Sequence, residues 1–201
     1  EIDSKSIDYF NNLIKRRLAR EPIAYILNEK EFWSKKFEVN NSTLIPRAET
    51  ELMVEKIVQI YKDKSISILD IGSGCGCILI GILTELRNST GLGIDISKQA
   101  TEIANKNSKR HKMTNRAKFL NNSIHEISNQ KFDLIVSNPP YIKSKNIKNL
   151  DEDIKYYEPL VALDGGNDGL DVIRKVIYKA KEILKINGLL AIEIGNRQYK
   201  K

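Results

Sequence analysis

The residues with the clearest chemical meaning are Asn138-Pro139-Pro140-Tyr141, which directly follow an apolar segment at 132–137. Adjacent prolines fix φ and carry no N–H, so their carbonyl groups are acceptors in a rigid frame. The Asn138 side-chain oxygen and the Pro139 carbonyl can each accept one N–H from a planar NH2 group, and the Tyr141 ring can stack on the amide or base that carries it. We interpret Asn138, Pro139 and Tyr141 as candidate catalytic residues; the alternative is an ordinary turn that ends a strand.

A second candidate site is a loop with glycines at alternate positions. Gly72, Gly74 and Gly76 come just after Asp70, and Cys77 stands where a dinucleotide-binding fingerprint has its third glycine. Closely spaced glycines let the backbone approach a ligand. An acid beside them suits a cationic ammonium group better than a pyrophosphate. A NAD-type loop or a purely structural turn is the alternative.

Asp95 ends the next apolar segment, where its carboxylate can accept hydrogen bonds from two ribose hydroxyls. Together with the glycine loop, this acid fits S-adenosylmethionine better than NAD. The chemistry this predicts is transfer of a methyl group from a sulfonium to a planar nitrogen. Because the sulfonium departs as a neutral thioether, the protein has mainly to orient the reactants and stabilise charge.

Apolar segments alternate with helical patterns along most of the chain, which predicts an α/β fold. We expect an open, mostly parallel Rossmann-like sheet with helices on both faces, whose ligands bind at the carboxyl ends of the strands. An amphipathic helix at 3–18 and a hairpin or irregular β segment at 23–44 come first. The expected strands are 65–70, 91–95, 118–120, 132–137 and 189–194, and the expected helices are 50–61, 77–86, 97–111 and 170–184.

Composition narrows the class of protein. With 201 residues, 41% of them hydrophobic, and a net charge of +7, the chain suits a folded domain and excludes disorder as a class. We expect no membrane span, because no apolar run is long enough. Two cysteines and two histidines predict neither a disulfide framework nor a metal site. We therefore expect a reduced, cytoplasmic protein, whose basic stretch at 103–125 is either a solvated surface or a nucleic-acid contact.

Three segments together resemble the protein-(glutamine-N5) methyltransferases of the HemK type: residues 44–51 (Leu-Ile-Pro-Arg-Ala-Glu-Thr-Glu), 70–76 and 138–142. Members of this family modify the glutamine of the Gly-Gly-Gln motif in peptide-chain release factors. The resemblance implies S-adenosylmethionine as cofactor and a release factor as protein substrate. It implies nucleic-acid binding only as a possibility that the reaction does not require.

The resemblance also assigns residues. Residues 138–141 would hold the substrate glutamine, so that Pro140 joins the three catalytic candidates, and Asn122 and Ser123 would contact the adenine. Arg47 and Glu49 would shape a lid over the methionine end or serve a structural role. The residues expected to bind the cofactor are Asp70, Gly72, Ser73, Gly74, Cys75, Gly76, Asp95, Ile96, Asn122, Ser123 and Asn138.

Both ends depart from the family pattern. We expect residues 1–45 to be a remnant of an N-terminal helical domain with a hairpin linker, and residues 46–201 to form the methyltransferase domain. Since the seven-stranded methyltransferase sheet needs two strands after 189–194, the sequence favours a fragment of a longer parent chain, with a fused or adjacent second domain as one possibility.

Two other functions stay open at this point. Enzymes that methylate the exocyclic amine of adenine or guanine use the same Asn-Pro-Pro-Tyr chemistry on a flipped base. They usually carry a separate base-reading domain, for which this chain has no room. The second alternative is a non-catalytic RNA- or ribosome-binding module. The intact Asp70, Asp95 and Asn138 argue against it.

Overall fold

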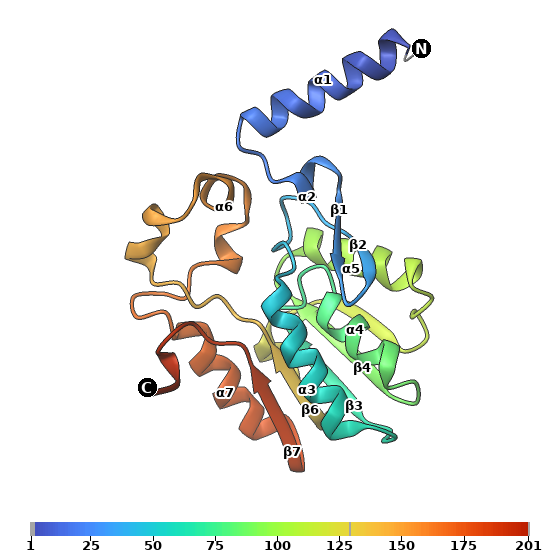
Figure 1. Cartoon of the computed structure of the whole chain (residues 1–201). Coiled ribbons are helices and arrows are strands. Elements are labelled where there is room, and N and C mark those ends of the chain that lie inside the picture. The colour runs from blue at the N-terminus through green and yellow to red at the C-terminus, as the bar shows by residue number, and fades with distance from the viewer. Residues whose placement is uncertain (1–2, 129, 201) are drawn as a thin grey trace.

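A parallel sheet lies at the centre of the computed structural model, which describes residues 3–128 and 130–200 (Figure 1). Its five strands, in the described part of the chain, have the order β5-β4-β3-β6-β7. All neighbouring pairs are parallel. The α/β class expected from the alternating pattern is confirmed. The strands are β3 (Ser67–Ile71), β4 (Thr90–Asp95), β5 (Ala117–Asn121), β6 (Phe132–Ser137) and β7 (Leu184–Ile192).

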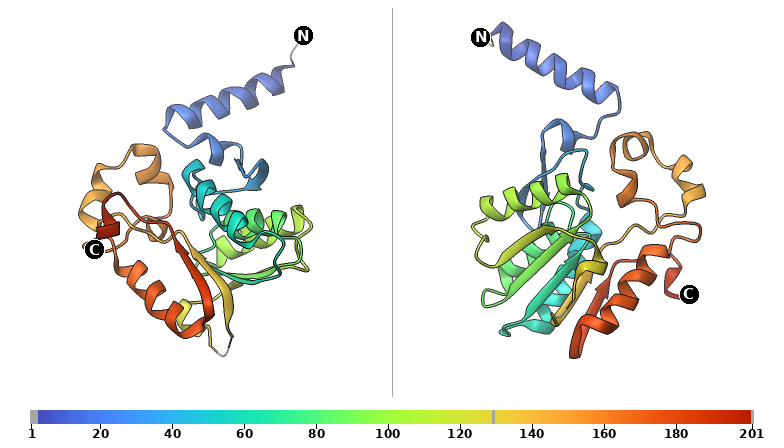
Figure 2. Two further views of the ribbon diagram at one scale, coloured as in Figure 1. Left: turned by 60° about the horizontal axis from the view of Figure 1, so that its bottom comes forward. Right: turned by 180° about the vertical axis from the view of Figure 1, so that it is seen from behind.

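Helices cover both faces of the sheet. The helices α3 (Glu51–Tyr61), α4 (Cys77–Glu85) and α5 (Lys98–Arg110) contribute buried side chains to one hydrophobic cluster. The helix α7 (Asp171–Ile183) packs against the opposite face, as the view from behind shows (Figure 2). It buries its apolar residues at three- and four-residue spacing, which is the pattern of an amphipathic helix lying on a sheet.

The strand order places the ends of β3 and β6 at a topological switch point. From β3 the chain adds β4 and then β5 on one side, and it returns to add β6 on the other side of β3. In open α/β sheets, ligands bind outside the carboxyl ends of the strands at such a point. The loop after β3 and the Asn-Pro-Pro-Tyr segment after β6 therefore lie side by side.

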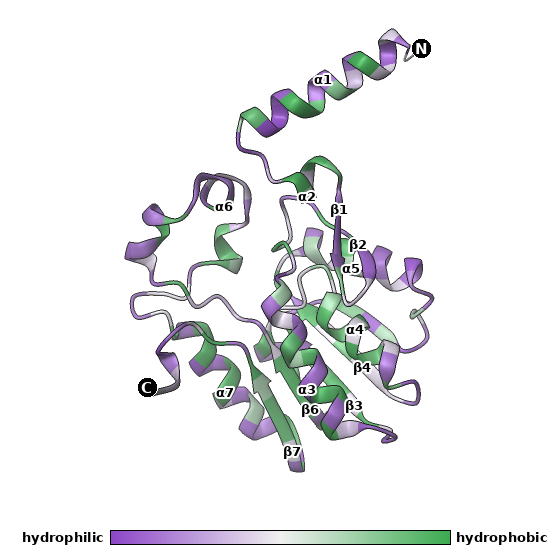
Figure 3. Cartoon of the chain, in the orientation of Figure 1, coloured by the Kyte–Doolittle hydropathy of each residue, from purple (hydrophilic) through white to green (hydrophobic). Residues whose placement is uncertain are grey.

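Residues before the sheet form a separate arm and a hairpin. The helix α1 (Ser4–Leu18) projects from the rest of the chain and has no buried residue, although hydrophobic and hydrophilic residues alternate along it (Figure 3). The short helix α2 (Ile23–Ile26) precedes the antiparallel pair β1 (Glu29–Phe32) and β2 (Lys35–Glu38). Phe32 and Phe37 of this hairpin belong to the same core as α3 and α4. The domain boundary at 45/46 stays a prediction.

The structure differs from the expected elements in several places, including the short helix α2 within the expected β segment 23–44. The strand β7 begins at Leu184 instead of residue 189, because Asn187 adopts φ 62° inside an irregularity that shifts the register against β6. The segment after Tyr141 contains three short helices: η3 (Ser144–Asn149), α6 (Glu152–Tyr157) and η4 (Leu160–Ala162). In the described residues, no helix has both the length and the apolar character needed to span a membrane.

Candidate active site

The glycine loop after β3 is attached to the end of β4. The backbone N–H groups of Gly72 and Ser73 donate to the carbonyl of Ile94, at 2.9 and 3.0 Å. Gly72 and Gly74 have φ values of 74° and 54°, in the left-handed region that favours glycine. A Cβ atom on either would meet nothing within 4 Å, so this side of the loop is open to a ligand.

Gly76 has a different role from the other two glycines. It is the N-cap of α4 with φ 82°, and a Cβ atom there would lie 2.7 Å from Cζ of Phe119. The absence of a side chain lets α4 and β5 approach each other. Gly76 thus contributes to packing beneath the loop, and any contribution to cofactor binding stays a prediction.

A cavity of about 330 Å³ opens beside the glycine loop. Its wall brings together residues from the ends of β3, β4, β5 and β6, as the switch point requires. Ile96 is 64% exposed and supplies apolar surface. The residues expected at the cofactor and found on this wall are Gly72, Ser73, Gly74, Cys75, Asp95, Ile96, Asn122, Ser123 and Asn138.

Asp95 is fixed by backbone donors on two sides. Its Oδ2 accepts from the N–H of Gly74 at 2.9 Å, and its Oδ1 accepts from the N–H of Ser97 at 2.8 Å. Burial raises the pKa of Asp95 above its usual value, while the two backbone donors lower it. Each carboxylate oxygen retains a lone pair for a further donor, such as a ribose hydroxyl.

Asp70 lies beneath the loop, outside the cavity wall. Its side chain is fully buried, and neither carboxylate oxygen has a hydrogen-bond partner among the described residues. Burial raises the pKa of Asp70 to about 7; the backbone N–H of Leu79 opposes this rise, and the nearby Asp95 carboxylate adds to it. The hydroxyl of Ser73 is also buried without a partner in the described chain. Direct contact between Asp70 and an ammonium group stays a prediction.

A second cavity, of about 180 Å³, adjoins the first. Pro139 and Tyr141 line this smaller cavity, whereas Pro140 lines the larger one. Asn138 lines both. The motif that we interpret as a holder for a planar nitrogen therefore separates two spaces, one beside the glycine loop and one away from it.

Arg47 also lines both cavities and is held by a carboxylate from the loop that follows α6. Its Nη2 donates to Oε1 of Glu158 at 2.6 Å, and the N–H of Ile45 donates to Oε2 of Glu158 at 3.2 Å. These bonds join the segment 44–47 to the loop that follows α6. Glu49, the other residue expected in a lid, is exposed and lies on neither cavity wall.

The Asn138 side chain is part of a hydrogen-bond network that the sequence did not predict. Its Nδ2 donates to Oγ1 of Thr50 at 3.3 Å, and Thr50 Oγ1 donates to Oε2 of Glu193 at 2.7 Å. The phenol of Tyr141 donates to Oε1 of Glu193 at 3.4 Å. Thr50 directly precedes α3 and Glu193 follows β7, so only the tertiary structure brings them to Asn138.

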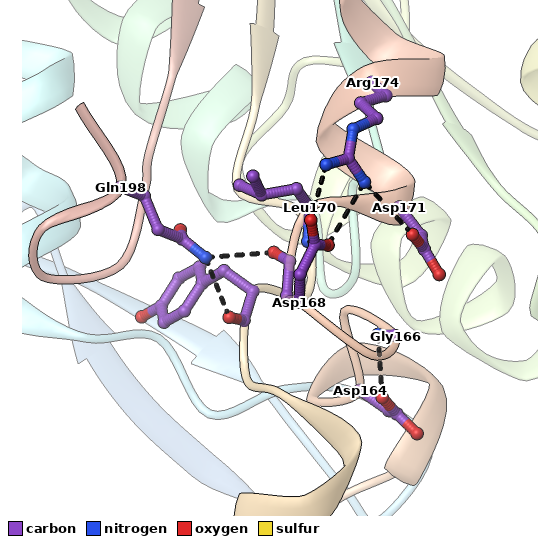
Figure 4. Close-up of polar contacts among 9 residues, drawn as sticks. Asp164, Gly166, Asp168, Leu170, Asp171, Arg174 and Gln198 are labelled. Carbon is purple, nitrogen blue, oxygen red and sulfur yellow. Dashed lines mark hydrogen bonds and ion pairs between the residues drawn. The ribbon is translucent and has the colours of Figure 1, made fainter. Parts of the chain in front are cut away.

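Gln198 holds the backbone around the same motif (Figure 4). Its Nε2 donates to the carbonyls of Tyr141 and Gly169, at 3.2 and 3.0 Å, and its Oε1 accepts from the N–H of Gly195 at 2.7 Å. Arg174 of α7 forms an ion pair with Asp168, which lies in the loop before α7. The segment after β7 thus connects the Tyr141 backbone to the loop before α7.

A model of the methyltransferase small domain family matches residues 47–154. The chain belongs to this family. A curated relative named release factor glutamine methyltransferase, from Caulobacter vibrioides, is 38% identical over 98% of this chain and 69% of its own length. A relative named bifunctional methyltransferase, from Rickettsia prowazekii, is 38% identical over the whole chain, which spans only 43% of that relative.

The fold of this methyltransferase also matches a solved structure. The hMettl16 catalytic domain in complex with a MAT2A 3′UTR hairpin has a TM-score of 0.61 and 16% sequence identity, over 81% of this chain and 62% of that one. At this level of identity the likeness concerns the fold alone. It supports the Rossmann-like methyltransferase architecture expected from the sequence.

S-adenosylmethionine is the cofactor of this methyltransferase, and the larger cavity fits it. The open side of Gly72 and Gly74 accommodates close approach of a ligand, and Asp95 has acceptor capacity for hydroxyl groups. Asn122 and Ser123 lie on the same wall. The unpartnered polar atoms of Asp70 and Ser73 lie just below, where a charged or polar ligand group in the loop would influence them.

Proposed function

We propose that this chain transfers a methyl group from S-adenosylmethionine to the side-chain amide nitrogen N5 of the glutamine in the Gly-Gly-Gln motif of peptide-chain release factors. The observation that carries the proposal is the position of Asn138 on the walls of both cavities. A methyl donor beside the glycine loop and a planar amide in the smaller cavity would meet at this residue.

The roles of the residues follow from this arrangement. When bound, the cofactor would supply the methyl group from a sulfonium centre. The rest of the cofactor departs as a neutral thioether. The Asn138 side-chain oxygen and the Pro139 carbonyl accept the two N–H groups of the glutamine amide, which orients its nitrogen toward the methyl carbon. A nitrogen–carbon bond forms as the carbon–sulfur bond breaks, and the nitrogen then loses one proton to water. The same acceptors stabilise the positive charge that develops on nitrogen.

The walls of the smaller cavity also orient the substrate amide. Tyr141 lines the smaller cavity and can stack on the planar amide, while Leu44 and Ile142 provide apolar surface beside it. Burial raises the pKa of the Tyr141 phenol, and the Glu193 carboxylate raises it further, so this ring stays neutral. Holding both reactants in one geometry can contribute about 7–11 kcal/mol to lowering the barrier.

The choice of a release factor rests on the relative from Caulobacter vibrioides, whose name gives release factor glutamine as its substrate. The sequence of the segment 44–51 supports the same choice. Methylation of an exocyclic amine in adenine or guanine is the alternative, and the acceptor experiment separates the two.

The test compares acceptors under one set of conditions. Purified protein is incubated with methyl-labelled S-adenosylmethionine and, separately, with a release factor, the same factor with its motif glutamine replaced by asparagine, tRNA, and duplex DNA. We expect label only in the unchanged release factor, with mass spectrometry locating the methyl group on the glutamine side chain. Label in tRNA or DNA, or equal label in the glutamine-replaced factor, would reject the proposal.

We propose that the chain acts in the cytoplasm, where release factors work, and that it is part of a longer protein with a second domain. The 43% share of the Rickettsia prowazekii relative supports the second point. Sequencing the complete reading frame and testing its product for a second methyl-transfer activity would check it.

A further inference from the structure

We infer that Glu193, acting through Thr50, sets which end of the Asn138 amide faces the substrate. This inference rests on the proposed function, in which the Asn138 oxygen has to accept an N–H from the glutamine. An asparagine side chain can be rotated so that its oxygen and nitrogen exchange places with almost no change in shape. Only the rotamer with the oxygen toward the glutamine can hold a donor NH2 group.

The hydroxyl of Thr50 decides between the two rotamers because it has a single proton. Oγ1 of Thr50 lies 2.7 Å from Oε2 of Glu193, and an ionised carboxylate can only accept a hydrogen bond. The Thr50 proton is therefore used toward Glu193. Toward Asn138, 3.3 Å away, the hydroxyl can then only accept, which places Nδ2 of Asn138 against Thr50. The side-chain oxygen of Asn138 is left for the substrate.

The surrounding contacts keep this network in place. The N–H of Glu193 donates to the carbonyl of Ser137 at 3.0 Å, which fixes the end of β7 beside the end of β6. Thr50 is 2% exposed, so water does not readily replace its partners. The phenol of Tyr141 donates to the second oxygen of Glu193, which keeps that carboxylate in its role as an acceptor. Glu193 is a positioning residue because it touches neither reactant.

Two chemical variants test the role of the carboxylate and of the hydroxyl. Glu193→Gln has the same shape but can donate through its amide, so Thr50 becomes free to donate to the Asn138 oxygen and the amide turns over. We expect kcat with a release factor to fall roughly 10- to 100-fold while the dissociation constant for S-adenosylmethionine changes less than about threefold. Thr50→Val should give the same loss, and Thr50→Ser should recover kcat to within about threefold of the wild type.

Two controls distinguish a loss of Asn138 orientation from a general effect of substitution on the enzyme. Glu182→Gln makes the same change at an exposed side chain of α7, paired only with Lys179 among the described residues, and should leave kcat unchanged. The double variant Thr50→Val/Glu193→Gln should be no slower than either single variant, because both act through one hydrogen-bond network. A wild-type kcat in Glu193→Gln, or equal losses in Thr50→Ser and Thr50→Val, would overturn the inference.

A second measurement does not depend on the acceptor. In 15N-labelled protein, the side-chain NH2 of Asn138 should show a nuclear Overhauser effect to the γ-methyl group of Thr50, and Glu193→Gln should abolish it. Persistence of this effect in Glu193→Gln, or its absence from the wild type, rejects the inference whatever the enzyme methylates. Failure of the wild type to methylate any release factor would instead reject the proposed function while these spectra still decide the orientation of Asn138.

Discussion

The guanidinium of Arg47 lies 2.6 Å from the carboxylate of Glu158, which stands 111 residues later in the chain. The Glu158 side chain is 1% exposed and its other oxygen accepts from the backbone of Ile45. This pair joins two segments that line both cavities. It also gives the buried Glu158 carboxylate partners that offset the free-energy cost of removing it from water.

Arg47→Met should lower the free energy of unfolding by about 1–3 kcal/mol, because Glu158 would keep its burial and lose its cation. Denaturant titration measures the change. Arg174→Met, at an ion pair whose side chains are 57% and 39% exposed, should lower the free energy of unfolding much less, because solvent screens this pair. If adding Glu158→Gln to Arg47→Met recovers none of the loss, the buried charge is not its cause.

Asn138→Ala should remove the group that orients the acceptor nitrogen and leave the glycine loop intact. We expect kcat to fall at least about 100-fold. Single-turnover methyl transfer measures the loss, and calorimetry should show cofactor affinity within a few fold of the wild type. Asn146→Ala, at an exposed position in η3, is the matched control. Undiminished transfer by Asn138→Ala would contradict the role given to this residue.

Asp95→Ala should weaken cofactor binding. The change removes the acceptor that we propose for ribose hydroxyls, and it leaves the N–H groups of Gly74 and Ser97 without their partner. We expect a loss of about 1–3 kcal/mol in binding free energy, measured by calorimetry. An unchanged dissociation constant would show that Asp95 only organises the loop.

The glycines of the loop should respond differently to the same substitution. In Gly76→Ala the new Cβ atom would press on the Phe119 ring, so we expect a loss of about 1–3 kcal/mol in unfolding free energy. In Gly74→Ala the added methyl group meets no protein atom, so the stability loss should stay near 1 kcal/mol and cofactor affinity should fall instead. Parallel thermal melts and calorimetry measure both quantities, and equal behaviour of the two variants would contradict this division.

Asp70 should make the stability of the protein depend on pH. Its folded pKa of about 7 exceeds the unfolded value of about 3.9, so between these values the folded state holds a proton that the unfolded state has released. The contribution of Asp70 to stability therefore falls as pH rises from about 4 to 7 and stays low above that.

Asp70→Asn removes this titration. We expect the variant to melt at least about 2–4 °C above the wild type at pH 8, with the difference shrinking as pH falls toward 4. Asp63→Asn, at an exposed turn residue with φ 61°, controls for loss of one negative charge. A melting difference that is the same at every pH would mean that Asp70 is not the titrating group.

Most of the sheet could be predicted from the sequence because strands buried on both faces need uninterrupted apolar residues. The strand 132–137 has the same bounds in the structure, and the other strands and the main helices lie where the pattern indicates them. The start of β7 could not be predicted, because Asn187-Gly188 reads as a turn while the chain forms an irregular pair with β6 there. Nor does any periodicity indicate the four-residue helix α2.

The candidate site was predictable where its residues directly follow strands. Gly72, Gly74, Asp95 and Asn138 meet at the switch point for that reason. Thr50, Glu158 and Glu193 were not recognisable as site residues, because their contacts join segments that are far apart in the sequence. For Thr50 the available signal was its place in the segment 44–51, which resembles the family, but a resemblance does not tell a positioning residue from a packing one.

The carboxylate that we infer to orient Asn138 follows β7, later in the chain than every wall residue of the glycine-loop cavity. The two cavities therefore depend on different parts of the chain: the wall beside the glycine loop uses residues up to Val176, whereas the network at Asn138 also needs the segment that follows β7. We therefore expect methyl transfer to depend on the pairing of β7 with β6, because that pairing holds Glu193 next to Thr50.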